Sequence, residues 1–414
     1  MNGAVLRTLQ AIDWDFAVPR AGYVAPPHWY PGTFVPALSD ALIEALTPVG
    51  GTVFDPYGGI GTTGWSAMRT GRSCRVSDIN PVALVVAYTT NALLALARRD
   101  RHLALVALGS VGRAIGRNDD LFGPNDATDS LRLDEALASL CASAPGDLLA
   151  AVVVRQPNWD ALRCWIEAET LSELQMLVGR VLEAKSAFVR LLGLSMISAT
   201  VRSISSQHAS WGHIADNVRP RELEKQNVTS ATARWLKRVK AFVEQPLAAP
   251  HDGLKPLVDV ARRDWSAANP NGPGDADLLL TSPPYADAID YTLAQRLSLY
   301  ILGYDDAGIL SLVAGEIGAR RKRFKTVSRT QWSEQLCAAL KDQVTWLKPG
   351  AAVCLVMPHK DSGRSAGEND MRATLRDLGW SLFFERDRSI HQSHTRQFWT
   401  SIKKETILVF TPAS

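Results

Sequence analysis

One stretch of the chain ends an apolar run with a hydroxyl group, two prolines and an aromatic ring. Residues 278–280 are all leucine, and Ser282, Pro283, Pro284 and Tyr285 follow after one threonine. A buried strand suits the leucines, but it cannot continue, because each proline lacks a backbone donor and restricts the residue before it. The stiff turn presents carbonyl oxygens, a hydroxyl group and a flat ring to any planar molecule that bears an amino group. An ordinary loop is the alternative, as for most Pro-Pro pairs.

A second stretch forms a glycine-rich turn between a predicted strand and a predicted helix. Its candidate ligand-binding residues are Asp55, Pro56, Gly58, Gly59, Gly61 and Thr62. Glycines allow positive φ angles and let the backbone approach a ligand closely. A Gly-x-Gly pattern alone is weak, but a strand before it and a helix after it are the context that predicts nucleotide binding.

An acidic residue follows this turn at the end of a second predicted strand. Residues 74–78 have the pattern of that strand, and Asp78 closes it. In nucleotide-binding folds an acid at this place accepts hydrogen bonds from the two hydroxyl groups of a ribose. A plain turn with a surface aspartate is the less favoured alternative for the two segments together.

Together these stretches resemble the motifs of the S-adenosylmethionine-dependent DNA amino-methyltransferases, which methylate N4 of cytosine or N6 of adenine. Residues 55–63 match the cofactor motif Asp-Pro-Phe-x-Gly-x-Gly-Thr-Thr, with Tyr57 in place of phenylalanine. Residues 282–285 match the serine form of the catalytic motif, which is more typical of N4-cytosine enzymes. The resemblance implies S-adenosylmethionine as the cofactor.

The resemblance also implies a fold and further cofactor contacts. The fold is an α/β Rossmann-like methyltransferase sheet, mostly parallel, that closes with an antiparallel hairpin and carries a helical insertion. His28 and Thr33 correspond to residues near the methionine end of the cofactor, and Asp264 to the residue that holds the adenine amino group. For Asp264 the alternative is an acid that balances two neighbouring arginines. Trp265 is a candidate for contact with the adenine face.

The catalytic turn suits methylation of an aromatic amino group. Such a group is a poor nucleophile, because its lone pair is delocalised into the ring. The Ser282 hydroxyl and the Pro283 carbonyl are expected to accept its two hydrogens and turn the lone pair towards the methyl group, while Tyr285 stacks on the base. Positioning and electrostatic fit then provide most of the acceleration, and a base in duplex DNA must first be flipped out.

Three regions of the chain differ in their expected organisation. Residues 1–100 hold the cofactor motif and residues 251–414 the catalytic motif, and we expect them to form the two halves of the methyltransferase domain. Residues 101–250 lack strand-like alternation, which predicts a helical insertion between the second and third strands with a share of target recognition. The predicted helices are 34–46, 81–99, 131–142, 161–181, 185–202 and 291–302, and residues 346–350 are predicted to end a further helix. The predicted later strands are 254–260, 277–280, 351–358, 380–386 and 406–410.

Basic residues in two places are candidate DNA contacts. Arg202 and Arg219 lie in segments of the insertion that are rich in hydrogen-bonding side chains. The densest basic cluster in the chain consists of Arg320, Arg321, Lys322, Arg323 and Lys325. Such side chains bind phosphates and give a salt-dependent affinity. Capped loops and solvated faces have the same composition, and they are the alternatives.

Composition sets wider limits on the function. The chain has 414 residues, of which 46% are hydrophobic and 21% charged, as is ordinary for a globular protein with a real core. A net charge of +3 excludes a uniformly polyanion-binding surface, so a nucleic-acid site must be local. The five cysteines show no paired metal-ligand spacing. We therefore expect reduced thiols, no metal, no membrane segment and a cytoplasmic protein.

The leading prediction is a site-specific N4-cytosine methyltransferase that acts on double-stranded DNA, such as the modification half of a restriction or defence system. An N6-adenine DNA methyltransferase or an RNA amino-methyltransferase is the alternative among enzymes. A non-catalytic nucleic-acid-binding protein of the same fold is the alternative from another class. The recognition sequence and the oligomeric state stay open at this point.

Overall fold

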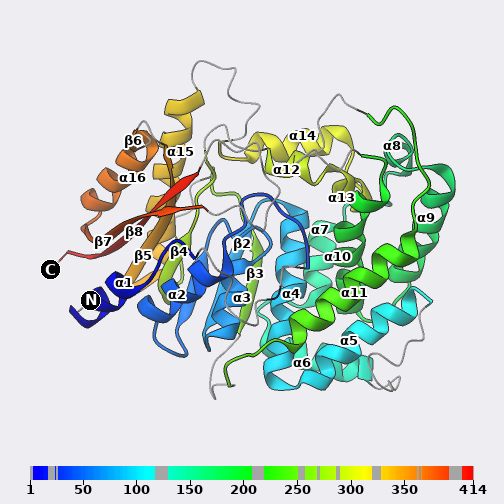
Figure 1. Ribbon diagram of the computed structural model, residues 1–414, viewed down its shortest axis with the longest axis horizontal. Coiled ribbons are helices and arrows are strands. Elements are labelled where there is room, and N and C mark those ends of the chain that lie inside the picture. Colours follow the sequence, from blue (N-terminus) through cyan, green and yellow to red (C-terminus); the bar gives the residue numbers. More distant parts are fainter. Residues whose placement is uncertain are drawn as a thin grey trace.

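A single mixed sheet forms the centre of the protein. The computed structural model describes residues 3–16, 24, 27–116, 129–207, 219–249, 257–267, 271–285, 290–318, 328–360, 363–364, 366–390 and 403–413. Within them the strands are β1 (Thr52–Asp55), β2 (Ser73–Asp78), β3 (Val258–Arg262), β4 (Ala276–Thr281), β5 (Leu347–Lys360), β6 (Gly363–Arg364), β7 (Trp380–Ser389) and β8 (Lys404–Pro412). Their order in the sheet is β3-β2-β1-β4-β5-β8-β7, and β6 pairs with β5 outside this path (Figure 1).

The polarity of the strands identifies the fold. β1 to β5 are parallel to one another, whereas β8 is antiparallel to β5 and β7 is antiparallel to β8. A mostly parallel sheet in this order, closed by an antiparallel hairpin, is the sheet of Rossmann-like methyltransferases. The predicted fold class is confirmed.

Helices cover both faces of the sheet (Figure 1). In the first half of the chain they are α1 (Gly3–Ala11), α2 (Pro36–Leu46), α3 (Thr62–Arg69), α4 (Pro81–Arg99), α5 (Arg101–Ala114), α6 (Asp129–Leu140), α7 (Pro145–Val152), α8 (Trp159–Leu162), α9 (Ala168–Leu182) and α10 (Ala187–Ile204). Those that follow are α11 (Val228–Glu244), α12 (Tyr291–Ala294), α13 (Arg296–Ile301), α14 (Asp306–Gly315), α15 (Ser328–Gln343), the 3₁₀ helix η3 (Val344–Trp346) and α16 (Ala366–Asp377).

The central strand β4 has both of its faces in the hydrophobic core. All six of its residues are buried. Because side chains alternate along a strand, Leu278 and Leu280 join the hydrophobic cluster that includes α4 and α10, while Leu279 joins the cluster that includes α15 and α16. A strand covered on both faces explains the continuous apolar run in the sequence.

α4 lies against the sheet and has the predicted bounds. The Asn80 side chain accepts a hydrogen bond from the Val82 amide, and Pro81 occupies the first helical turn. α4 and α10 are each long and apolar enough to cross a membrane, but 100% and 72% of their apolar windows are buried within this fold. Burial on nearly all sides accounts for their composition.

Three predicted elements differ from the observed ones in kind or continuity, and the strand predicted over 254–260 is observed as β3, Val258–Arg262. The single helix 161–181 is wrong, because the Glu167 side chain caps α9 as a separate helix and leaves α8 as one short turn. The helix expected over 291–302 is two short helices, α12 and α13. The pattern of residues 346–350 predicts a helix end, whereas β5 already begins at Leu347.

The helices α5 to α11 lie between β2 and β3 in the chain, in the region with a predicted helical insertion. α10 contacts α4, α9 and α11. The apolar residues of these helices belong to the same hydrophobic cluster as one face of the sheet. The region 101–250 therefore shares a core with the sheet.

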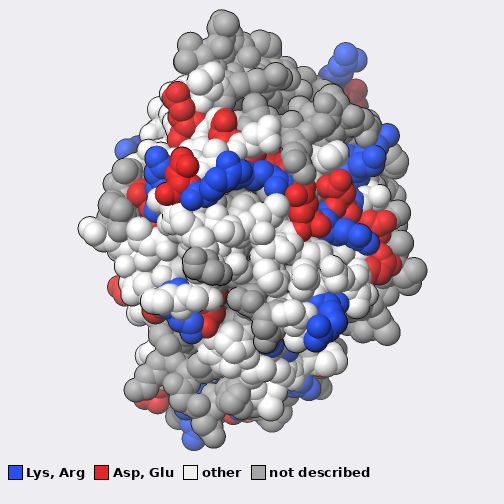
Figure 2. All heavy atoms as spheres, turned by 90° about the vertical axis from the view of Figure 1, so that its left-hand side faces the viewer, with Lys and Arg blue, Asp and Glu red and all other residues white. Residues whose placement is uncertain are grey.

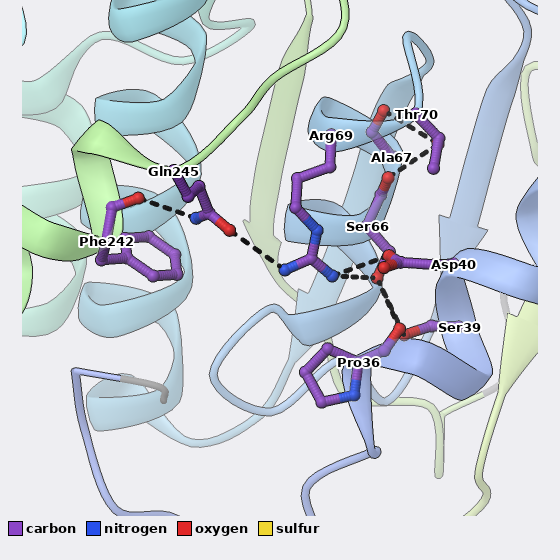
Figure 3. A network of polar contacts seen from close by, with 9 residues as sticks. All are labelled: Pro36, Ser39, Asp40, Ser66, Ala67, Arg69, Thr70, Phe242 and Gln245. Carbon is purple, nitrogen blue, oxygen red and sulfur yellow. Dashed lines mark hydrogen bonds and ion pairs between the residues drawn. The ribbon is translucent and has the colours of Figure 1, made fainter. Parts of the chain in front are cut away.

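A polar network joins α3 to α2 and α11 (Figure 3). The Arg69 guanidinium donates hydrogen bonds to Asp40 at 2.7 Å, to the Ser66 hydroxyl at 3.2 Å and to the Gln245 side chain at 3.3 Å. The Ser39 and Ser66 hydroxyls are 2.9 Å apart and extend the network within the core. These contacts hold α3 between an N-terminal helix and the last helix before β3.

Candidate active site

The two sequence motifs emerge from neighbouring strands. β1 and β4 are paired in parallel, so their carboxyl ends lie at the same edge of the sheet. The Asp55 carboxyl group joins them, since it accepts hydrogen bonds from Thr63 Oγ1 at 2.6 Å and from Thr281 Oγ1 at 2.7 Å. Burial raises the pKa of Asp55 to about 6, and these hydrogen bonds partly oppose the rise. The glycine turn and the Ser-Pro-Pro-Tyr turn therefore begin side by side.

The glycine turn has no room for side chains at two of its positions. An added Cβ on Gly58 would lie 2.3 Å from Val76 Cγ1, and one on Gly61 would lie 2.5 Å from Asn91 Nδ2. Gly59 and Gly61 have φ angles of 53° and 86°, which side chains disfavour. Glycine is needed here for close packing as well as for backbone conformation.

Asp78 connects the second strand to the glycine turn. Its carboxyl group accepts hydrogen bonds from the Gly59 amide at 3.0 Å and from the Asn80 amide at 2.8 Å. Burial raises the pKa of Asp78 to about 6. A carboxylate has further lone pairs, so these two contacts leave room for ribose hydroxyl groups.

The surroundings of this turn fit the adenosine part of S-adenosylmethionine. The buried Thr62 Oγ1, at the start of α3, has no hydrogen-bond partner among the residues that the structure describes. A buried polar atom without a partner is costly, unless a ligand satisfies it. The Thr62 hydroxyl, the glycine backbone and the Asp78 carboxyl group together suit a ligand that carries a ribose and a polar base.

The two candidates after β3 have different environments. Asp264 is exposed, and its Oδ1 accepts hydrogen bonds from the Ser266 amide at 2.8 Å and from the Ser266 hydroxyl at 2.6 Å. Its Oδ2 faces Gly315, on which an added Cβ would lie 3.4 Å away. Trp265 is only 5% exposed and donates a hydrogen bond to the Pro56 carbonyl at 2.9 Å. The predicted contact of Trp265 with an adenine face is therefore wrong, since its buried ring supports the glycine turn from the core.

His28 and Thr33 shape the segment that precedes α2. The His28 ring nitrogens lie 2.7 Å from the Trp29 carbonyl and 2.8 Å from the Ser198 hydroxyl, so both are engaged within the protein. Burial lowers the pKa of His28 to about 4, which makes the ring neutral at pH 7. The Thr33 hydroxyl donates to the Tyr30 carbonyl at 2.8 Å. Both predicted cofactor residues are thus seen holding this segment, which carries Tyr30.

Tyr30, Tyr291 and Glu316 lie at the same edge, and of these three the sequence did not indicate Glu316. An added Cβ on Gly59 would lie 3.2 Å from Tyr30 Cε1, so the Tyr30 ring contacts the glycine turn. The Tyr30 and Tyr291 rings stack with centroids 6.3 Å apart. Glu316 accepts a hydrogen bond from the Thr292 amide at 2.9 Å. Burial chiefly, and then the nearby acids Asp290 and Asp78, raise the pKa of Glu316 to about 8.

The catalytic turn is held by side chains from distant elements. The Ser282 hydroxyl donates to Tyr285 Oη at 2.8 Å, and Tyr285 Oη donates to Glu405 Oε1 at 3.2 Å. Trp332 Nε1 donates to the Pro284 carbonyl at 3.0 Å. Asp290 stands at the N-cap position of α12 without a side-chain capping hydrogen bond. The Thr292 amide at the start of this helix donates its hydrogen bond to Glu316 instead.

The candidate DNA contacts are only partly within the described residues. The Arg202 guanidinium lies 4.1 Å from the centroid of the Trp29 ring, and burial lowers its pKa. Arg219 is exposed. The basic cluster Arg320, Arg321, Lys322, Arg323 and Lys325 lies outside the described residues.

One face of the molecule mixes charges of both signs. Figure 2 shows the side over α1, β7 and α16, where basic residues form a band flanked by acidic ones. Among the described residues on this side there is no broad basic surface of the kind that follows a nucleic-acid backbone. In the described part of the chain no group of three or more histidine, cysteine, aspartate or glutamate residues is placed to hold a metal ion.

The fold and the paired motifs define the protein as one of the Rossmann-like methyltransferase fold. No protein-family model and no curated protein matches the chain. One similar solved structure is the rRNA methyltransferase aviRa from Streptomyces viridochromogenes, with 10% sequence identity, coverage of 97% of this chain and 94% of that chain, and a TM-score of 0.31. A similarity this low carries no argument, so the fold class rests on the order and polarity of the strands.

Proposed function

We propose that this chain transfers a methyl group from S-adenosylmethionine to the N4 amino group of cytosine in double-stranded DNA. The main support is the meeting of the glycine turn and the Ser-Pro-Pro-Tyr turn, which Asp55 joins by hydrogen bonds to Thr63 and Thr281. Ligands held at two adjacent turns are neighbours, as direct transfer between them requires. When bound, S-adenosylmethionine supplies an electrophilic methyl group and leaves as a thioether.

The residues that would hold the cofactor surround the glycine turn. Asp78 accepts ribose hydroxyl groups, the Thr62 hydroxyl donates to or accepts from the ligand, and the backbone at Gly59 allows close approach. Tyr30 closes this side of the turn, because its ring touches Gly59. Asp264 follows the end of β3 and would accept a hydrogen bond from an adenine amino group.

The residues of the catalytic turn act on the amino group of the base. The Ser282 hydroxyl donates its hydrogen to Tyr285, which leaves its lone pairs to accept an amino hydrogen. The Pro284 carbonyl is occupied by Trp332, whereas the Pro283 carbonyl accepts no hydrogen bond from the described residues and is the second acceptor. Two acceptors hold the amino hydrogens and direct the nitrogen lone pair towards the methyl carbon. The new N–C bond forms as the S–C bond of the cofactor breaks, and the nitrogen releases one proton to solvent water.

The choice of cytosine rests on the serine form of the motif, and the choice of DNA on the resemblance of both motifs to DNA enzymes. A flipped base must reach the turn, since the amino group is inaccessible inside a duplex. A partner nuclease is expected if methylation at the same site protects DNA from cleavage.

The test is incubation of the purified protein with radiolabelled S-adenosylmethionine and either duplex DNA or RNA, followed by digestion to nucleosides. N4-methylcytosine from DNA supports the proposal, and we expect Ser282→Ala to lower the rate by about 100-fold. The exposed Ser172→Ala is the matched control, with an unchanged rate. N6-methyladenine in the digest would show that adenine is the target base instead of cytosine. Label in RNA alone would show that RNA is the substrate instead of DNA. Cofactor and DNA binding without any transfer would show a binding protein and overturn the proposed activity.

A further inference from the structure

A continuous row of hydrogen bonds runs from the catalytic turn into the far end of the sheet. Ser282 donates to Tyr285 Oη, and Tyr285 Oη donates to Glu405 on β8. The other carboxyl oxygen of Glu405 pairs with Arg388 on β7, and Arg388 Nε donates to the Trp14 carbonyl at 2.9 Å. Arg388 is only 4% exposed, so this charge pair is shielded from water.

The chemistry of Arg388 and Glu405 fixes which group donates and which accepts in each of these hydrogen bonds. A guanidinium only donates and a carboxylate only accepts, so Glu405 must accept from both Arg388 and Tyr285. Tyr285 has one hydrogen, and once it is donated to Glu405 the oxygen of Tyr285 only accepts. Burial raises the pKa of Tyr285 far above its usual range, which keeps that hydrogen in place. Ser282 is then the donor, and its lone pairs are turned away from Tyr285.

We propose that Glu405 is a positioning residue, which fixes the Ser282 hydroxyl as a hydrogen-bond acceptor through Tyr285. This inference rests on the proposed function, since it concerns how the amino group of the substrate is held. It assigns the antiparallel hairpin of β7 and β8 a part in catalysis, although neither strand contains a sequence motif. Glu405 touches no substrate in this role.

Replacing Glu405 by glutamine removes the fixed direction of these hydrogen bonds. Arg388 can be satisfied only by the amide oxygen, so the amide nitrogen faces Tyr285 and donates to it. The Tyr285 hydrogen is then free to point to Ser282 or to the Val356 carbonyl, which lies 3.4 Å away. The Ser282 hydroxyl loses its fixed orientation, and the enzyme holds the amino group less well in the transition state.

We expect Glu405→Gln to lower kcat by about 10-fold with little change in KM for DNA or cofactor. Tyr285→Phe keeps the ring but removes the same link, and we expect a similar loss. The double variant is expected to be no slower than Tyr285→Phe alone, because both changes break one pathway. A Glu405→Gln effect that is equally large in the Tyr285→Phe background would overturn the inference, since the residue would then act through the fold.

The matched control is Glu385→Gln, on the neighbouring strand β7. Glu385 pairs with Arg372 at 2.8 Å, outside the row, and its loss should leave kcat unchanged. Thermal unfolding of all variants separates a loss of fold from a loss of orientation. An unchanged kcat for Glu405→Gln in an active enzyme overturns this inference alone, whereas an inactive wild-type protein overturns the proposed function.

Discussion

Asp55 and Thr281 are 226 positions apart in the chain, yet their side chains are hydrogen-bonded at 2.7 Å in the core. Asp55 ends the strand before the glycine turn, and Thr281 ends the strand before the catalytic turn. This contact fixes the distance between the two motifs. Any ligand pair that reacts across them depends on it.

Thr281→Val tests that link. The change keeps the shape of the side chain but removes one of the hydroxyl groups that the buried Asp55 carboxyl group uses. We expect a loss of about 1–3 kcal/mol in the free energy of unfolding, measured by urea titration, and slower methyl transfer. Thr47→Val is the control, because the buried Thr47 Oγ1 has no partner among the described residues and its removal should cost nothing. Equal losses in the two variants would contradict the role of the link.

Gly61→Ala tests the glycine turn. The new methyl group would lie 2.5 Å from Asn91 Nδ2 and 3.0 Å from Ala87 Cα, at a φ of 86°. We expect a destabilisation of about 1–3 kcal/mol and a loss of S-adenosylmethionine binding measured by calorimetry. Gly146→Ala in α7 has open space around it and should raise stability by about 0.5–1 kcal/mol. Normal cofactor binding by Gly61→Ala would show that the turn does not hold the ligand.

Stability should fall as the pH rises towards 8. Burial raises the pKa of Glu316 from 4.5 to about 8, and those of Asp55 and Asp78 from 3.8 to about 6. The folded protein therefore holds protons that the unfolded chain releases, so this stabilisation is full below about pH 4 and is lost as the pH rises through 6 and 8. In urea titrations, Glu316→Gln should make the free energy of unfolding depend less on pH above pH 6. The exposed Glu222→Gln should not, and a wild-type stability that rises from about pH 5 to 9 would contradict the prediction.

Arg202 should contribute to nucleic-acid affinity from its place over Trp29. We expect Arg202→Gln to weaken duplex binding several-fold. The slope of log affinity against log salt concentration should become shallower by about 1, because one cation contact is lost. Fluorescence titrations at several salt concentrations measure both quantities. Lys225→Gln removes the same charge from a residue paired with Glu169 and serves as the control. An unchanged salt dependence for Arg202→Gln would remove this residue from the proposed DNA surface.

The sequence alone determined the bounds of α4 and the two motifs, because these depend on local patterns, and the resemblance of the motifs to a known family implied the fold class. An apolar run between residues that interrupt regular structure predicts a buried strand. Pro81 after Asn80 predicts the start of a helix whatever the tertiary structure is. The break between α8 and α9 escaped prediction, because apolar periodicity continues through a stretch in which Glu167 caps a new helix.

Only the tertiary structure decided which other side chains meet the motifs. Tyr285 and Glu405 are 120 positions apart, and Tyr30 touches Gly59 from a segment outside the sheet. No spacing in the chain encodes such contacts, since they arise when strands from distant segments become neighbours in the sheet. The same reason explains Trp265, whose place after β3 suggested a ligand contact, although its ring packs against Phe54 and Trp346 in the core.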